Sequence, residues 1–496
     1  MNHSLLRSTK FAWISFLLAP PLGIVLVWLQ GSVWRTVKVV ATVAVLPLTF
    51  FYLNLLTGLR IQFAGDMVPI VEFWRPSRHI ARLEEHRSHM NRPLAHTEST
   101  VHDAESSPAE PLPAAAWPGF RGPNRDGIVA GLQLADWPAA GLRELWRQPV
   151  GGGHGSFAIA YGRAFTIEQR REQEVVTCYD LNSGSELWSF PYHADFRELM
   201  GGPGPRATPT IDGDRLYALG AVGHLHCLDT ATGKLLWQVN ILADNEATNL
   251  QWAMSGSPLV DGERVIVNPG GRSGKSVVAY DRETGKCVWR GGDDPAGYAS
   301  PTIGTLCGVR QVLTFTGNSI VGNSLADGRQ LWRHPWETYQ MINVCQPIVL
   351  GDDRIFISSS YGNGAAVLQL SARDERIEVR TVWQTQDLKL KFASAVHYDG
   401  FLYGLDESIL VCLDPATGKR RWKGGRYGYG QLLLAGDSLV IQAESGEVVR
   451  VRATPDRHEE LSRFRALPDK TWNYPAIGEG KLLVRNAREM ACYELR

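Results

Sequence analysis

The stretch Cys227–Trp237, which reads CLDTATGKLLW, carries an Asp, a Gly and a Trp at intervals of four residues. The same intervals recur from Asp180, Asp281 and Asp414, and Ser324 takes the place of Asp in a further copy. Asp can open a tight turn by bonding its own backbone, and Gly adopts positive φ without a Cβ clash. Short alternating apolar runs flank each copy, so the repeated unit reads as a β-hairpin.

Tryptophan is large and apolar and has one N–H donor, so we expect each repeated indole to pack on a flat surface of a neighbouring unit. The peptide plane of a repeated Gly is such a surface. The structural repeat residues are Gly184, Trp188, Gly233, Trp237, Gly285, Trp289, Gly328, Trp332, Gly418 and Trp422.

The spacing of these hairpins predicts the architecture. Neighbouring markers lie 39 to 52 residues apart, and a four-stranded propeller blade usually takes about 40–50 residues. The markers are Trp146, Trp188, Trp237, Trp289, Trp332, Trp383, Trp422 and Phe464. A segment with an early proline lies upstream of many hairpins, at Pro209, Pro258, Pro301, Pro347 and Pro475. Proline lacks a donor for the strand ladder, which suits the innermost strand of a blade.

Counting the inner strands predicts an all-β, eight-bladed β-propeller of four-stranded antiparallel blades. The first marker has no inner strand of its own, and the segment 473–495 ends before any outer strand. We therefore expect residues 145–150 to supply the outer strand of the last blade, which closes the ring and removes its open edges.

Residues 1–60 are predicted to form a membrane anchor with two transmembrane helices, 11–33 and 39–56, because both runs are apolar and of spanning length. A single span or a cleaved signal peptide is the alternative. Residues 61–82 read as a juxtamembrane segment. The composition of 83–116 is too polar to bury a core, so this part is predicted to be a disordered linker. The propeller is assigned to 117–496.

Charge and cysteine content exclude several classes of protein. Lys plus Arg and Asp plus Glu both number 51, without a basic block, so no nucleic acid partner is expected. The seven cysteines lie at least 20 residues apart, which argues against a disulfide framework or a cysteine metal site. His224 and His226 share one strand face but lack a third ligand, so no metal site is expected.

The loops that lead into the inner strands all open on one face of the ring, where aromatic and basic side chains would surround a channel mouth. Such concave surfaces are where binding hot spots concentrate. The alternative is structural: Trp252 and Trp472 would pack in the core, and Arg206 would bond backbone carbonyls. The predicted binding residues are His154, Arg206, Trp252, Tyr298, Gln346, Lys391, Arg426, Tyr427, Trp472 and Asn473.

The pattern Asp-x-x-Thr-Gly-Lys-x-x-Trp at 229–237, 281–289 and 414–422 resembles the PQQ-like (pyrroloquinoline-quinone-like) β-propeller repeat family. The opening stretch Trp117–Gly127 is similar to the start of membrane-associated bacterial members described as BamB-like. The resemblance implies an eight-bladed ring at the cell inner membrane, with the propeller outside the cytoplasm. BamB-like lipoproteins are attached through an N-terminal cysteine, whereas this sequence has no Cys before Cys178, so membrane spans would replace the lipid.

The resemblance leaves two functions open, because this fold hosts enzymes and scaffolds alike. We expect a non-catalytic scaffold that binds other proteins in envelope or outer-membrane protein assembly, with no cofactor. The alternative is a PQQ-dependent quinoprotein oxidoreductase of the alcohol or sugar dehydrogenase type. Such enzymes carry an adjacent cysteine pair beside the cofactor and calcium ligands, and no two cysteines are adjacent in this sequence.

Overall fold

The computed structural model describes residues 9–90, 113–374 and 376–495. These residues form two compact units, Met1–His79 and Ile80–Arg496. We refer to them as the N-terminal unit and the propeller unit.

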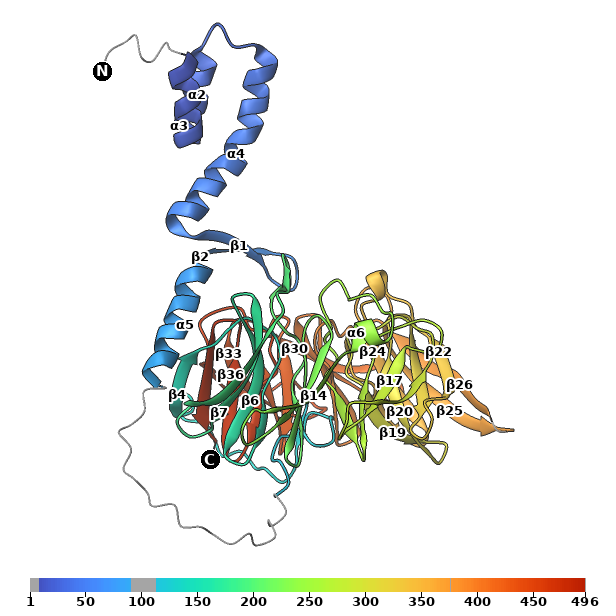
Figure 1. Ribbon diagram of the computed structural model, residues 1–496. Helices are drawn as coiled ribbons and strands as arrows, with labels where there is room; N and C mark the ends of the chain where they lie inside the picture. Colours follow the sequence, from blue (N-terminus) through green and yellow to red (C-terminus); the bar gives the residue numbers. More distant parts are fainter. Residues whose placement is uncertain (1–8, 91–112, 375, 496) are drawn as a thin grey trace, which may run out of the picture. The chain divides into compact units, whose positions relative to one another are not determined.

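The propeller unit confirms the predicted ring of eight blades, each a sheet whose strands follow one another from the axis outward (Figure 1). Blade one comprises β5 (Ala158–Ala160), β6 (Arg163–Arg170), β7 (Gln173–Asp180) and β8 (Glu186–His193), and blade two comprises β11 (Thr210–Asp212), β12 (Arg215–Leu219), β13 (His224–Asp229) and β14 (Leu235–Asn240). Blade three comprises β15 (Leu259–Asp261), β16 (Arg264–Val267), β17 (Val277–Asp281) and β18 (Cys287–Gly291). Blade four comprises β19 (Thr302–Leu306), β20 (Val309–Phe315), β21 (Ser319–Ser324) and β22 (Gln330–Pro335).

Blade five comprises β23 (Ile348–Gly351), β24 (Arg354–Ser359), β25 (Gly364–Arg373) and β26 (Arg376–Thr385), and blade six comprises β27 (Val396–Tyr398), β28 (Phe401–Asp406), β29 (Ile409–Leu413) and β30 (Arg420–Arg426). Blade seven comprises β31 (Gln431–Ala435), β32 (Ser438–Gln442), β33 (Glu447–Arg452) and β34 (Glu460–Arg465). Blade eight comprises β35 (Ala476–Gly478), β36 (Lys481–Arg485), β37 (Glu489–Glu494) and β4 (Glu144–Pro149). The predicted closure is confirmed, because β4 pairs antiparallel with β37 and places Trp146 opposite Cys492.

The outer-strand tryptophan of one blade lies on the turn glycine of the next. A Cβ added to Gly285, which has a φ of 69°, would lie 2.6 Å from the indole of Trp237. The Nε1–H of Trp237 donates to the carbonyl of Arg282 in the same turn, at 2.9 Å. The same bond to a carbonyl of the next blade is made by Trp146, Trp188, Trp289, Trp383 and Trp422.

Trp332 departs from this pattern, because its Nε1–H donates to Oε1 of Gln311 in its own blade at 2.5 Å. The next blade has no turn glycine at this level. Its strands β25 and β26 are ten residues long and turn beyond Arg373.

A belt of hydroxyl groups joins the segments that lead into the inner strands of blades one to four. The amide of Ser156 donates to Oγ1 of Thr208, and the amide of Thr208 donates to Oγ of Ser257, both at 2.9 Å. Ser257 donates in turn to Oγ of Ser300. Three of these residues precede the repeated prolines, so the proline segment satisfies a buried amide of the preceding blade.

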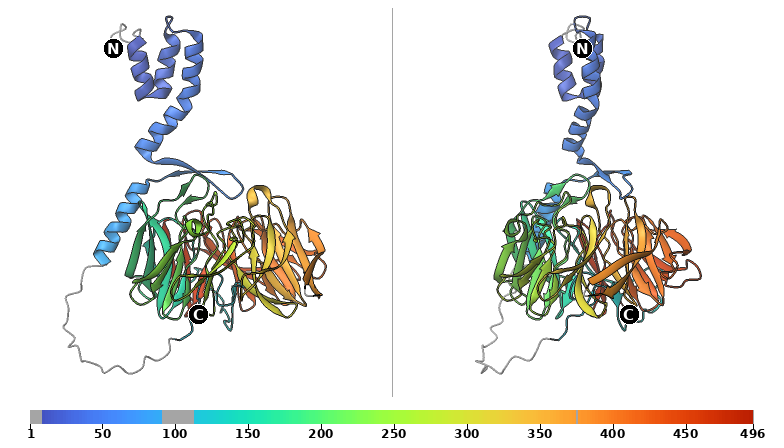
Figure 2. Two further views of the ribbon diagram at one scale, coloured as in Figure 1. Left: turned by 45° about the vertical axis from the view of Figure 1, so that its right-hand side comes forward. Right: turned by 90° about the vertical axis from the view of Figure 1, so that its right-hand side faces the viewer.

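The N-terminal unit differs from the prediction of two spans. Residues 11–33, predicted as one span, fold back into two helices, α2 (Thr9–Leu18) and α3 (Pro20–Leu29) (Figure 2). Oγ1 of Thr9 lies 3.2 Å from Oγ of Ser32, which places the start of α2 beside the end of α3. A proline disfavours helical backbone at the residue before it, and Pro20 leaves Ala19 non-helical.

Helix α4 (Arg35–Thr57) contains the second predicted span and is the one helix, among the residues described, that is long and apolar enough to cross a membrane. After α4 come the strands β1 (Leu59–Phe63) and β2 (Pro69–Phe73), which pair as a hairpin.

Helix α5 (Pro76–Met90) corrects the start of the predicted linker, since residues 83–90 are helical. The reason is tertiary packing, which composition does not reveal: Leu83 and Arg87 are buried in the propeller unit. Residues 91–112 of the predicted linker lie outside the described ranges.

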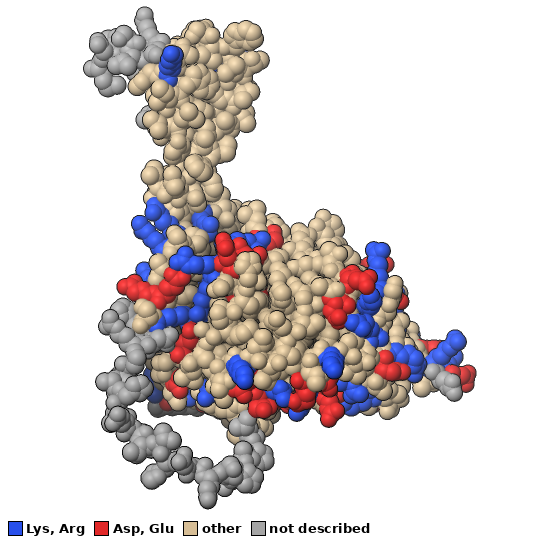
Figure 3. All heavy atoms as spheres, in the orientation of Figure 1, with Lys and Arg blue, Asp and Glu red and all other residues tan. Residues whose placement is uncertain are grey.

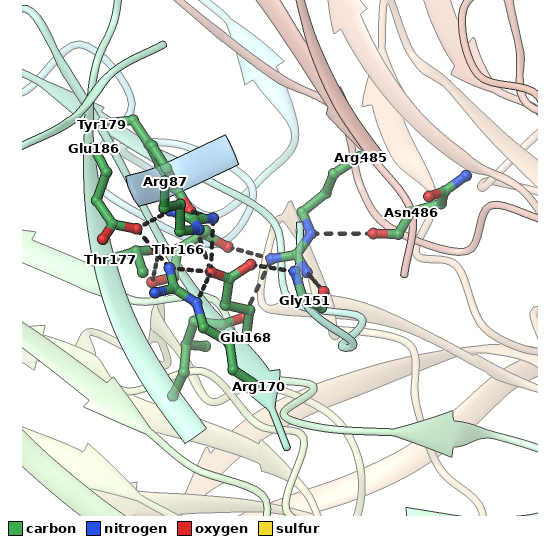
Figure 4. Close-up of polar contacts among 11 residues, drawn as sticks. Arg87, Gly151, Thr166, Glu168, Arg170, Thr177, Tyr179, Glu186, Arg485 and Asn486 are labelled. Atoms are coloured by element: carbon green, nitrogen blue, oxygen red, sulfur yellow. Dashed lines mark hydrogen bonds and ion pairs between the residues drawn. The ribbon is translucent and has the colours of Figure 1, made fainter. Parts of the chain in front are cut away.

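A buried network of charges holds Arg87 against blade one (Figure 4). Arg87 lies 3.1 Å from Oε1 of Glu168 and also pairs with Glu186. Arg170 lies 2.5 Å from each of the same two carboxylates. From blade eight, Arg485 donates to Oγ1 of Thr166 at 2.7 Å. Burial alone would raise the pKa of Glu168, but Arg170, Arg87 and Arg485 outweigh it and lower this pKa to about 2.

We predict that Gly285→Ala lowers the free energy of unfolding by about 1–3 kcal/mol more than Gly262→Ala does. Both glycines have positive φ, but a Cβ at Gly262 meets nothing within 4 Å, whereas one at Gly285 meets the indole of Trp237. Urea unfolding followed by tryptophan fluorescence measures the difference. Equal losses for the two variants would show that the indole and glycine contact contributes nothing.

We predict that Glu168→Gln destabilises the protein at pH 7 and that the difference from the wild type narrows in acid. The pKa of Glu168 is depressed from 4.5 to about 2. Its contribution, up to about 3 kcal/mol, is therefore complete above pH 4.5 and is lost as pH falls towards 2. Unfolding free energies across this pH range test the prediction, with Glu263→Gln at an exposed site as the control. A constant difference at all pH values would contradict it.

Candidate functional site

The loops leading into the inner strands lie on one face of the ring, which we call the crown face. The strands of a blade alternate in direction, so the loops between its two middle strands open there as well. Side chains from both sets of loops form what we call the crown. Its members are His154, Arg206, Trp252, Tyr298, Tyr361, Lys391, Phe392, Tyr429 and Trp472.

One half of the crown is a chain of aromatic rings around a lysine. The ring of Trp472 lies 5.6 Å from that of His154 and 5.1 Å from that of Phe392. Phe392 lies 5.6 Å from Tyr429. The ammonium group of Lys391 is 4.8 Å from the ring of Tyr429 and 5.5 Å from the rings of Phe392 and Tyr361. Cation–π interactions of this kind hold the positive charge of the lysine over the faces of the aromatic rings.

The other half is organised by Arg206, which supports backbone carbonyls. Its Nε–H donates to the carbonyl of Trp252 at 3.1 Å, and Nη2 donates to Gly202 at 2.8 Å. Trp252 contacts Tyr298, with ring centroids 6.0 Å apart. The structural interpretation of Arg206 is therefore correct, although the side chain also lies in the crown.

Histidine 154 joins the two halves. Its Nε2–H donates to the carbonyl of Gly201 at 2.5 Å, in the loop that Arg206 supports. Burial, together with the charge of Arg206, lowers the pKa of His154 to about 3, so the ring is neutral at pH 7. Burial also lowers the pKa of Arg206 to about 10, which leaves its guanidinium charged. Near pH 7, His154 is therefore neutral and Arg206 is positively charged, and small changes of pH alter neither charge.

Four of the predicted binding residues lie outside the crown. Gln346 and Asn473 are buried beneath it. The backbone amide of Gln346 donates to Oγ of Ser394, and the side chain of Asn473 donates to carbonyls of the loop before β5. Arg426 is exposed and donates to Ser408. Tyr427 is buried with its hydroxyl 2.8 Å from Nε2 of His458, towards the outer strands.

Sequence reasoning missed Phe392, Tyr429 and Tyr361. Phe392 and Tyr429 precede inner strands, so the rule that found Lys391 and Trp472 could have found them. Tyr361 lies between β24 and β25, where no repeated motif marks it.

Exposed apolar side chains project from two loops of the same face. Leu199, 80% exposed, lies at the tip of a short hairpin formed by β9 (Arg197–Glu198) and β10 (Gly202–Pro203). Tyr339, 70% exposed, and Met341 belong to η1 (Tyr339–Met341). In Figure 3, uncharged surface covers much of the upper middle of the propeller, while charged side chains gather along its lower rim.

The axis is occupied by the segment Trp117–Val129, which we call the axial segment. Trp117 exchanges backbone hydrogen bonds with Ile159 on β5, and Pro118 accepts one from Ile211 on β11. The two-residue strand β3 (Ile128–Val129) pairs in parallel with β31.

Two arginines fasten the axial segment to opposite sides of the ring. Arg121 is buried and donates to the carbonyl of Ala395 at 2.6 Å. Arg125 donates to the carbonyls of Pro258 and Ser257 at 2.7 and 2.9 Å. The protein's own chain therefore crosses the expected channel and bonds backbone groups at the inner strands of blades one, two, three, six and seven.

Cysteine and metal-ligating side chains bear on the quinone alternative. Within the described ranges, no group of three or more His, Cys, Asp or Glu side chains is placed to hold a metal ion. All seven cysteines are free, and five of them are buried.

Comparison with known proteins identifies the repeat. Residues 171–424 match the family model described as outer membrane protein assembly factor BamB. The chain belongs to this family. The PQQ-like repeat predicted from the Asp, Gly and Trp pattern is thereby confirmed.

Both quinoprotein dehydrogenases and BamB itself are similar to this BamB-like chain. The quinoprotein ethanol dehydrogenase of Pseudomonas aeruginosa is 24% identical over 340 residues, which cover 60% of this chain and 52% of that enzyme. The chain thus spans about half the length of this curated relative. The structure of BamB from Moraxella catarrhalis matches with a TM-score of 0.50 and 16% identity, covering 72% of this chain and 98% of that one.

The quinohemoprotein alcohol dehydrogenase of Comamonas testosteroni matches with a TM-score of 0.53 and 14% identity, covering 77% of this chain and 80% of that one. At such identities, these structures establish the fold alone.

We predict that Arg121→Ala loosens the axial segment, because the side chain bonds two carbonyls, those of Asp126 and Ala395, that lie in a buried site. Hydrogen exchange at Leu434, whose amide donates to Gly127, should accelerate at least tenfold. Arg143→Ala, at an exposed ion pair with Glu494, is the control. Unchanged protection of Leu434 would show that Arg121 does not hold the segment.

Proposed function

We propose that this protein is a membrane-tethered, non-catalytic β-propeller that binds other proteins of the cell envelope through its crown face. The observation that carries the proposal is the combination of the crown with the exposed side chains of Leu199 and Tyr339 on one face. Aromatic anchors surrounded by adaptable apolar groups are the usual energetic centre of protein interfaces.

Family membership supports the same function, since the matching model is described as an outer membrane protein assembly factor. In this proposal, α4 anchors the protein in the inner membrane and the propeller lies outside the cytoplasm.

The chemistry of the crown indicates what the partner presents. Lys391 lies among three aromatic rings, and the ammonium group of Lys470 lies 3.9 Å from the ring of Trp472, so positive charge is held beside the aromatic rings of the crown. A partner segment that presents apolar or aromatic side chains to these rings matches this arrangement. A loop or an extended strand supplies such side chains.

We predict that p-benzoylphenylalanine at Leu199 or Tyr339 crosslinks to one envelope protein in living cells. Lys391→Glu and Trp472→Ala should each reduce the yield at least tenfold, because each removes part of the crown. Arg426→Ala is the matched control, since Arg426 lies outside the crown and bonds Ser408. Equal yields in all three variants would contradict binding through the crown.

The alternative is a PQQ-dependent oxidoreductase, which the similarity to quinoprotein ethanol dehydrogenase favours. The sequence lacks the adjacent cysteine pair of such enzymes, which argues against this alternative. We predict that the purified protein, incubated with PQQ and calcium, neither develops a quinone absorption band nor reduces a dye with alcohols or sugars. Saturable binding of PQQ with alcohol-dependent dye reduction would overturn the scaffold proposal.

A further inference from the structure

The hairpin β1–β2 has one apolar face and one polar face. Its paired residues on one face are Leu59 with Phe73, Ile61 with Val71, and Phe63 with Pro69. The other face pairs Arg60 with Glu72 and Gln62 with Ile70. Nε2 of Gln62 donates to Oε1 of Glu72 at 2.6 Å, so the polar face is internally bonded.

The apolar face is exposed, which is unusual for a two-stranded sheet. Ile61, Val71 and Phe73 are 41%, 61% and 70% exposed, respectively. An isolated two-stranded hairpin is at best marginally stable in water, and an apolar face requires cover.

The hairpin is fixed to the C-terminal end of α4. Gly58 ends the helix in the left-handed conformation, and Leu59 begins β1 directly after it. The amide of Trp74 donates to the carbonyl of Gly58 at 2.8 Å. The guanidinium of Arg75 bonds the carbonyls of Leu55 and Leu56 in the last turn of α4. The hairpin therefore cannot move far from the end of this helix.

The length of α4 sets the level at which the hairpin would lie in a membrane. Its 23 residues extend about 34 Å, slightly more than the ~30 Å hydrocarbon core of a bilayer. The hairpin therefore begins where hydrocarbon gives way to lipid headgroups. Trp74, with the guanidinium of Arg60 5.6 Å from its ring, and Arg75 are residue types that favour this zone.

We propose that the hairpin β1–β2 lies on the bilayer surface, with Ile61, Val71 and Phe73 among the upper acyl chains and the face of Arg60 and Glu72 towards water. This inference rests on the proposed anchoring through α4. The partner is the lipid bilayer itself, and the hairpin acts as a second, interfacial contact beside the single span.

Photo-crosslinking of the full-length protein in liposomes of phosphatidylethanolamine and phosphatidylglycerol tests the inference. p-Benzoylphenylalanine is placed at Ile61 or Val71 on the apolar face, and at Gln62 or Glu72 as matched positions on the polar face. Mass spectrometry should find at least fivefold more lipid adducts from the apolar positions.

Val43 in α4, which is exposed and apolar, provides the reference position within the span. Lipid adducts at Val43, but none at Ile61 and Val71, would overturn the hairpin inference alone. Protein adducts at Ile61 and Val71, whether to the propeller, a second copy or another protein, would overturn it too. An absence of lipid adducts at all three positions would overturn the anchoring proposal as well.

Discussion

The structure depends on one repeated contact, in which the indole of one blade lies on the turn glycine of the next and donates its N–H to that turn. Trp237 and Gly285 show the contact in full, since a side chain at this glycine would collide with the ring. Wherever it occurs, the contact fixes an outer strand to the neighbouring blade independently of the loops. Because the ring is held from its outer strands and its inner belt, the loops of the crown face are free to carry function.

Much of the fold could be predicted because its determinants are local and periodic. An Asp, a Gly and a Trp at intervals of four residues specify a hairpin, and a proline marks an inner strand. The position of Arg121 could not be predicted, because its bond to Ala395 joins residues 274 positions apart. The fold-back at Pro20 could not be predicted, because a proline signals an interruption of the helix but not its angle.

The candidate site was predictable in part. Loop position placed His154 and Trp472 on the crown face, because every loop before an inner strand opens on one face. The same rule placed Tyr427 in the crown, but its hydroxyl forms hydrogen bonds with His458 and Glu460 instead. Side-chain direction depends on such tertiary partners, which a motif does not contain. The fold alone is shared by dehydrogenases and BamB, so the crown carries the functional argument.

A cryo-electron microscopy structure of the protein purified from its own membranes, in a nanodisc, tests the central claim most directly. The account predicts density of a second protein over the crown, in contact with the side chains of Lys391 and Trp472, and an axis filled by residues 117–129. Density for a quinone cofactor at the axis, with the crown uncovered, would contradict it.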